Sequence, residues 1–139
     1  TSNAGWDTIK YADFLKLVIA DLKGHGIRTS IFVDTNEQNI IHAKATGTDR
    51  IELYTEPYAT LFPVDPEKAV KNFAGAAKIA LDLGLGFNAG HDLSLQNLRY
   101  FVQNVPGVLE VSIGHALISD ALYYGLENTI QMYLGQLSY

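Results

Sequence analysis

Two histidines and one glutamate occupy positions from which side chains can move protons. His91 directly follows Gly90 after an apolar segment, and His115 directly follows Gly114 after another. Glu52 lies inside a third segment of the same kind. An imidazole can donate or accept a proton near neutral pH, whereas a carboxylate inside an apolar strand needs a partner or a raised pKa. If these segments are neighbouring strands, the pattern predicts a site for acid–base chemistry.

The glycine before each histidine favours an anionic ligand. Gly90 allows a ligand to approach the backbone closely, and the helix expected soon after His91 presents free N–H groups at its start. Gly114 and His115 repeat this arrangement before another expected helix. The end of the last strand is a common phosphate position in (β/α)₈ barrels. The two pairs therefore predict phosphate binding.

Each of these residues also has a structural explanation. Glu52 can form a structural ion pair with Arg28 or Arg50 inside the fold. Such ion pairs also perturb the pKa values of carboxyl groups, so a perturbed carboxyl group is not always functional. His91 can be a surface loop residue, and His115 can cap or pack a helix. From the residues alone, both explanations stay open.

Metal and dinucleotide sites are not predicted. His25 lies in an expected helix-to-strand turn and His42 lies in an expected helix, so we expect surface or structural roles for both. No His-x-His or His-Glu-x-x-His spacing is present. Gly84-Leu-Gly86 precedes its strand, whereas a dinucleotide fingerprint follows one.

Alternating strands and helices are expected to position these residues. The predicted strands are 28–34, 50–55, 85–90 and 110–114. The predicted helices are 6–23, 35–46, 67–83, 95–104 and 118–137, the last broken near Gly125. Residues 56–66 hold three of the four prolines and are expected to form a connection. Such alternation predicts an α/β fold of parallel strands with a site at their carboxyl ends, in either a small doubly wound sheet or half of a closed barrel.

Composition limits the possible partners. The chain has 139 residues, of which 47% are hydrophobic and 18% charged, as in globular domains. A net charge of −5 disfavours nucleic acid and anionic membranes as partners, but allows small phosphorylated substrates. The absence of cysteine excludes disulfides, thiolate metal sites and cysteine nucleophiles. No signal peptide is visible and no apolar run approaches ~18 residues, so we expect a cytoplasmic location.

Four segments together resemble the pyridoxine 5′-phosphate synthase family. They are Arg28-Thr-Ser-Ile-Phe-Val-Asp34, Arg50-Ile-Glu-Leu-Tyr-Thr55, Phe87-Asn-Ala-Gly-His-Asp-Leu93 and Val111-Ser-Ile-Gly-His-Ala116. The last two are specific to the family, and the strand pattern of the first is generic. The resemblance implies that residues 1–139 form the C-terminal half of one (β/α)₈ TIM barrel domain, in a family that typically assembles as octamers. It implies that the N-terminal half is a partner, and that the chain alone is inactive.

The same resemblance implies an activity and a set of site residues. The family condenses 1-deoxy-D-xylulose 5-phosphate with 3-amino-2-oxopropyl phosphate to pyridoxine 5′-phosphate, phosphate and water, without a cofactor or a metal. Glu52 matches a glutamate that stabilises the transition state, and His91 matches a proton donor. The matched substrate and phosphate contacts are Thr1, Asp92, Gly114 and His115. Asp92 stands where the family often has glycine, and Asn3 and Ala4 depart from the family's loop pattern.

Two other classes are compatible with strand–helix alternation. One is a sugar-phosphate isomerase or aldolase, but an aldolase needs a Schiff-base lysine on a strand. Lys68, Lys71 and Lys78 all fall on one expected helix. The other class is a non-enzymatic module like a response regulator, which needs an acidic cluster after its first strand and a strand-end lysine. Neither feature is present.

Overall fold

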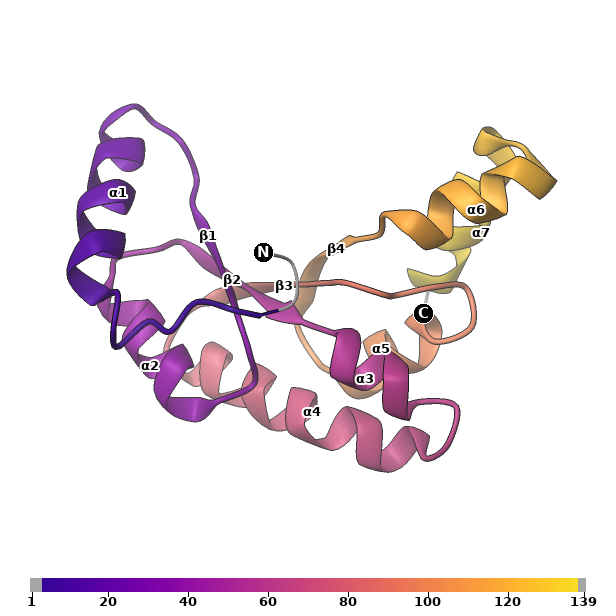
Figure 1. The fold of residues 1–139 in the computed structure, drawn as a ribbon, viewed down its shortest axis with the longest axis horizontal. Helices are drawn as coiled ribbons and strands as arrows, with labels where there is room; N and C mark the ends of the chain where they lie inside the picture. Colours follow the sequence, from indigo (N-terminus) through magenta and orange to yellow (C-terminus); the bar gives the residue numbers. More distant parts are fainter. Residues whose placement is uncertain (1–3, 138–139) are drawn as a thin grey trace.

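Four short strands with alternating apolar residues form one parallel sheet in the computed structural model, which describes residues 4–137 (Figure 1). The strands are β1 (Ser30–Val33), β2 (Arg50–Tyr54), β3 (Gly86–Gly90) and β4 (Val108–Ser112). They pair in sequence order, each parallel to the next. The predicted α/β class with four parallel strands is therefore confirmed.

Seven helices accompany the strands within residues 4–137. They are α1 (Ala12–Gly24), α2 (Glu37–Ala45), α3 (Glu56–Leu61), α4 (Pro66–Asp82), α5 (Leu98–Asn104), α6 (His115–Tyr124) and α7 (Leu126–Leu137). Local sequence explains where two of them begin. The Asn36 side chain accepts hydrogen bonds from two backbone N–H groups at the start of α2, and the Asp65 side chain accepts one at the start of α4. The break at Gly125, where φ is 79°, separates α6 from α7 as predicted. None of the described helices is long and apolar enough to cross a membrane.

Residues 56–66 were predicted only as a connection, and the structure shows that part of it, Glu56–Leu61, forms helix α3. Pro57 lies in the first turn, where its missing N–H costs nothing. Tyr58 is fully buried and its ring lies edge-on to Phe101 with centroids 4.9 Å apart. Tertiary packing of this aromatic side chain therefore stabilises a helix too short to be recognised from its sequence.

Several element boundaries also differ from the prediction. Helix α1 begins at Ala12 instead of residue 6, because Asp7 caps a separate turn by accepting hydrogen bonds from the N–H groups of Ile9 and Lys10. Helix α5 begins three residues later than predicted. Strand β4 begins and ends two residues earlier than expected, and α6 begins three residues earlier. The shift of β4 accompanies an irregular register against β3 near Asn88.

The two faces of the sheet differ in polarity. The alternate residues Ile31, Val33, Ile51 and Leu53 are buried in the main core with residues of α2, α4 and α5. Figure 1 shows α2 and α4 running along one side of the sheet. The opposite face carries charged residues, among them Arg50 at the start of β2 and Glu110 in the middle of β4. There the Glu110 carboxylate accepts hydrogen bonds from Arg28, at 3.0 Å, and from Arg50, at 2.7 Å. These bonds, that of Arg50 above all, lower the pKa of Glu110.

Asp49, just before β2, connects its own segment to the end of α1 and to the residue before β1. Its carboxylate accepts hydrogen bonds from the Lys23 ammonium at 2.8 Å and from the Thr29 N–H at 2.9 Å. The Lys23 hydrogen bond first, and the Thr29 N–H next, lower the pKa of Asp49 to about 2. Asp49 is thereby part of the scaffold, at the end of the sheet away from the predicted site.

We expect Asp49→Asn to lower the melting temperature at pH 7 and to make unfolding less sensitive to acid. The pKa of Asp49 is lower in the folded chain than its ordinary value of 3.8. Its contribution to stability is therefore present above that value and is lost as the pH falls toward about 2. Thermal unfolding followed by circular dichroism across this range measures the effect. The control is Asp82→Asn at the exposed end of α4. A loss that is equal at both ends of the pH range would contradict the assignment.

Candidate active site

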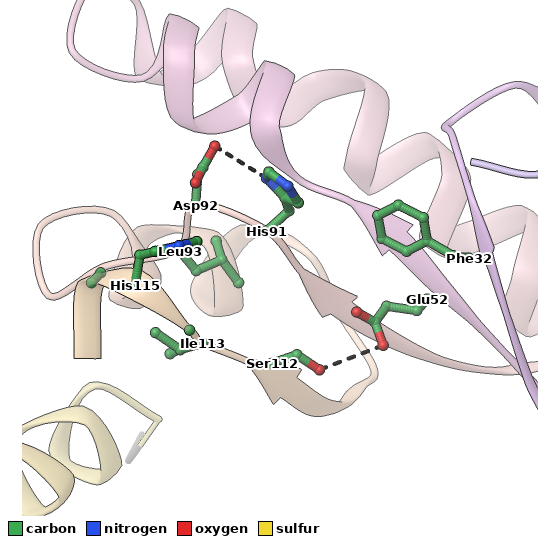
Figure 2. A pocket seen from close by; sticks show the side chains of 10 residues that line it. Phe32, Glu52, His91, Asp92, Leu93, Ser112, Ile113 and His115 are labelled. Carbon is green, nitrogen blue, oxygen red and sulfur yellow. Dashed lines mark hydrogen bonds and ion pairs between the residues drawn. The ribbon is translucent and has the colours of Figure 1, made fainter. Parts of the chain in front are cut away.

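A cavity of about 540 Å³ opens at the carboxyl ends of the strands (Figure 2). It is lined by Phe32, Glu52, His91, Asp92, Leu93, Ser112, Ile113, Gly114, His115 and Ala116. Five of the six predicted site residues are therefore gathered around one space, although they come from three separate segments of the chain. The sixth, Thr1, lies outside the described residues. Carboxyl ends of parallel strands are where α/β proteins commonly bind ligands.

Glu52 projects from β2 beneath this cavity. Strand alternation buries its neighbours Ile51 and Leu53 on the other face and leaves Glu52 half-buried. The Ser112 hydroxyl donates a long hydrogen bond of 3.5 Å to Glu52 Oε2. Desolvation by burial raises the pKa of Glu52, and the charge of Glu110 adds to this effect, whereas the Ser112 bond opposes it. The site thus holds a carboxyl group that retains its proton to a higher pH than usual.

The structural ion pair considered for Glu52 is not formed. Arg28 and Arg50 bind Glu110 instead. Arg50 lies two residues before Glu52 on the same strand, so its side chain emerges ~7 Å nearer the amino end of the sheet. Within residues 4–137, Glu52 has no lysine or arginine partner at ion-pair distance. A half-buried carboxyl group without a cation is more typical of a functional site than of a scaffold.

Gly90 makes room for the Glu52 carboxyl group. A Cβ atom at position 90 would collide with Glu52 Oε1 and would lie 3.0 Å from the Ser112 Cβ. The register of β2, β3 and β4 brings these three residues together. The sequence singled out Gly90 for the approach of a ligand, and the structure shows that it also admits the carboxyl group of a neighbouring strand.

The backbone turns sharply at His91 and Asp92, directly after β3. Their φ angles of 96° and 57° are positive, which is uncommon for residues other than glycine and stores strain. His91 Nδ1 is buried and lies 3.1 Å from Asp92 Oδ2, a close contact without hydrogen-bond geometry (Figure 2). The Tyr54 ring packs edge-on against the imidazole, with ring centroids 5.1 Å apart. Both contacts hold the imidazole at the cavity wall.

Gly114 and His115 form the start of helix α6 on another side of the cavity. Gly114 is the N-cap residue, and no other group lies within 4 Å of the place where its Cβ would be. The first N–H groups of an α-helix have no acceptor within the helix and attract anions. The open space at Gly114 lets an anion reach them.

The segment before α1 runs beside the carboxyl end of β1. The Trp6 N–H donates to the Phe32 carbonyl at 2.7 Å, and Gly5 packs directly on the Val33 backbone. The Thr8 hydroxyl donates to the Asn39 carbonyl at 2.7 Å. These contacts bring residues 5–8 to the end of the sheet where the cavity lies.

Not every polar residue at a strand end joins the cavity. Asp34 accepts hydrogen bonds from the Asn36 N–H and the Asn39 side chain, so it stabilises the turn after β1.

Phe32 and Ser112 line the cavity but were not predicted. Alternation along the strand could have revealed Ser112, which lies two residues before Gly114. Phe32 reaches the cavity because it pairs with Glu52 in the sheet, a register that the structure shows. No group of three or more acidic or histidine side chains within residues 4–137 is arranged to hold a metal ion.

These features define a class of protein. It is a parallel α/β protein with a cavity at the carboxyl ends of its strands, where a carboxyl group of raised pKa, two histidines and a helix N-terminus meet. Such a combination suits acid–base chemistry on a small anionic ligand.

Comparison with known proteins identifies the family. The sequence model of pyridoxal phosphate biosynthesis protein PdxJ matches residues 1–138, and the chain belongs to this family. It is 63% identical over 134 residues to the pyridoxine 5′-phosphate synthase of Christiangramia forsetii, a match over 96% of this chain and 56% of that protein. It is 58% identical over 137 residues to that of Flavobacterium johnsoniae, covering 99% of this chain and 58% of that protein. The chain spans just over half the length of these curated relatives.

We expect Gly90→Ala to destabilise the fold by about 1–3 kcal/mol, because an added methyl group in a filled space forces its neighbours apart. The Glu52 carboxyl group and Ser112 are the groups that must move. Urea unfolding measures the change. The matched control is Gly75→Ala in helix α4, where the methyl group meets nothing within 4 Å and should stabilise by about 1 kcal/mol. Equal effects of the two substitutions would contradict the close approach of Glu52.

We expect Glu52→Gln to make the chain more stable at neutral pH. Because burial raises the pKa of Glu52, the folded state favours the protonated carboxyl, and stability declines as the pH rises through this raised pKa. Glutamine resembles the protonated form and removes the decline. Denaturant unfolding at several pH values between about 4 and 8 measures it. A variant that loses stability increasingly as the pH rises would show that the ionised carboxylate stabilises the fold.

Proposed function

We propose that this chain is the C-terminal half of a (β/α)₈ barrel that synthesises pyridoxine 5′-phosphate. The reaction condenses 1-deoxy-D-xylulose 5-phosphate with 3-amino-2-oxopropyl phosphate and releases phosphate and water. One observation carries the proposal: Glu52, His91, Asp92, Gly114 and His115, the residues that match the family's motifs, line a single cavity. Membership of the family and the printed names of the relatives support it.

The proposal of a half-barrel rests on the strands and on length. Among the described residues, β1 and β4 each have a neighbour on one side only. Unpaired strand edges are a liability that closure of a barrel removes. Four strands are half of the eight in such a barrel, and the chain spans 56–58% of its relatives. The remaining half of the barrel is therefore the proposed partner, with residues 1–139 contributing to a single domain.

In the proposed mechanism the amine of one substrate adds to the ketone of the other, and loss of water gives an imine. Proton transfers then lead to elimination of phosphate, addition of water and ring closure. His91 donates a proton to a leaving oxygen from the cavity wall. Glu52 stabilises developing positive charge or orients a water molecule. These steps need no cofactor or metal.

Substrate phosphates are the proposed ligands of the remaining site residues. Gly114 and His115 offer the N-terminus of α6 to the phosphate of 3-amino-2-oxopropyl phosphate. Asp92 contacts the same group through its backbone N–H, so its carboxylate need not face the phosphate. Thr1 is proposed to contact the other substrate, 1-deoxy-D-xylulose 5-phosphate. By resemblance to the family we further propose a homo-octamer in the cytoplasm, without nucleic-acid or membrane partners.

The direct test supplies the missing half. The part of the Christiangramia forsetii synthase that this chain does not match is produced as a separate polypeptide and mixed with this chain, and the two are also joined as one. We expect pyridoxine 5′-phosphate to form from the two substrates only when both parts are present. A folded, fully assembled barrel that forms no product would overturn the proposal.

In the assembled protein we expect Glu52→Gln and His91→Asn each to lower kcat by ~10²-fold or more, because each removes a group that acts in the transition state. Steady-state product formation measures this. The matched controls are Glu67→Gln, in the first turn of α4, and His25→Asn, an exposed residue at the other end of the strands. Near-normal turnover in both site variants would contradict the assigned roles.

A further inference from the structure

Two buried polar side chains lie behind the His91–Asp92 turn, and the proposed chemistry does not use either. Thr55, at the end of β2, is fully buried, and Asn97, before α5, is 5% exposed. Neither lines the cavity. A buried polar side chain is costly unless its hydrogen bonds are made, so the partners of these two residues show what they hold in place.

Both side chains bind carbonyl groups of the turn. The Thr55 hydroxyl donates to the His91 carbonyl at 2.5 Å, while the Thr55 N–H donates to the Gly90 carbonyl at 3.0 Å. The Asn97 amide donates to the Asp92 carbonyl at 3.2 Å. Two successive carbonyl groups, belonging to the two residues of positive φ, are therefore each tied to a buried side chain from a different element.

Asn97 is itself held firmly. Its side-chain oxygen accepts a hydrogen bond of 2.8 Å from the Ser94 N–H, and its backbone carbonyl accepts one of 2.7 Å from the hydroxyl of buried Tyr58. Helix α3, which supplies Tyr58, thereby supports the turn after β3. These contacts tie the turn to buried residues that do not line the cavity.

Peptide geometry converts these contacts into a direction for two N–H groups. A trans peptide is planar, so its N–H points opposite to its C=O, and the described chain contains no cis peptide. With the carbonyls of His91 and Asp92 directed to Thr55 and Asn97, the N–H groups of Asp92 and Leu93 point away from them. Asp92 and Leu93 both line the cavity. Within residues 4–137, neither N–H group donates a hydrogen bond.

We propose that Thr55 and Asn97 are positioning residues that hold the N–H groups of Asp92 and Leu93 toward the cavity as a pair of donors for a phosphate group. Successive N–H groups in such a turn form a concave anion site. The Asp92 carboxylate lies against His91 Nδ1. It therefore does not occupy the backbone N–H groups of the turn, which remain available to an anion. The inference rests on the proposed function in one respect only, namely that the bound phosphate group belongs to a substrate of the proposed reaction.

The test uses inorganic phosphate as the probe, titrated into ¹⁵N-labelled chain assembled with the complementing half described above. We expect the amide signals of Asp92 and Leu93 to shift with phosphate. Thr55→Val removes the hydroxyl at nearly constant volume and should weaken phosphate binding by about tenfold, because charge-assisted hydrogen bonds depend strongly on geometry. Thr55→Ser retains the hydroxyl and should restore most of the affinity. Asn97→Asp removes the donor to Asp92 and should weaken binding at least as much.

The matched control is Thr46→Val at the opposite end of the sheet. Thr46 is also buried, and its hydroxyl donates to the Ala43 carbonyl at 2.7 Å. A structural role alone predicts that Thr46→Val and Thr55→Val lower the melting temperature alike and leave phosphate affinity unchanged. The positioning role predicts lost affinity for Thr55→Val but not for Thr46→Val, with the KM of the phosphorylated substrates rising more in Thr55→Val than kcat falls.

The outcomes separate this inference from the proposed function. If phosphate binds and the variants weaken it while no pyridoxine 5′-phosphate is formed, the positioning role stands and the proposed reaction fails. If product forms but Thr55→Val and Asn97→Asp bind phosphate as tightly as the parent, the positioning role is overturned. Unshifted Asp92 and Leu93 signals, or loss of folding in both variants, would likewise overturn it.

Discussion

The register of β2 against β3 and β4 is the constraint on which the candidate site depends. It places the Glu52 carboxyl group over Gly90 and beside Ser112, in a space that no larger residue at position 90 would leave. A shift of one residue would turn Glu52 to the helix-covered face, because side chains alternate along a strand. Burial of Ile51 and Leu53 opposes that shift, so the hydrophobic core stabilises the position of the site's carboxyl group.

The carboxylates on and beside the sheet differ in their partners. Glu110, in the middle of β4, binds two arginines, and Asp49, just before β2, binds Lys23. These contacts lower the pKa values of both carboxyl groups. Glu52 lies level with Glu110 across Asn88, but among residues 4–137 it has no such partner and its pKa is raised. The ion pairs of Glu110 and Asp49 therefore stabilise the fold, whereas Glu52 is left without a cation beside the cavity.

The turn after β3 illustrates how strain and support are combined. His91 and Asp92 adopt positive φ angles that neither side chain favours. Hydrogen bonds from Thr55 and Asn97 oppose relaxation of the turn, and Tyr58 fixes Asn97 in turn. The short helix α3 contributes to the site by carrying Tyr58, although none of its residues lines the cavity. The strained segment is thus supported by the buried core.

Local sequence determined the order of the strands and of every helix except α3, the caps at Asn36 and Asp65, and the positions of Glu52, His91 and His115 beside the cavity. These features follow from alternation, capping side chains and glycines, which act over a few residues. Only the tertiary structure decided that Glu110, and not Glu52, pairs with the arginines, that residues 56–61 form a helix, and that Thr55 and Asn97 support the turn. The bond from Asn97 to Asp92 spans only five residues. The other outcomes depend on contacts between residues at least 36 positions apart in the chain, whose distances no local pattern encodes.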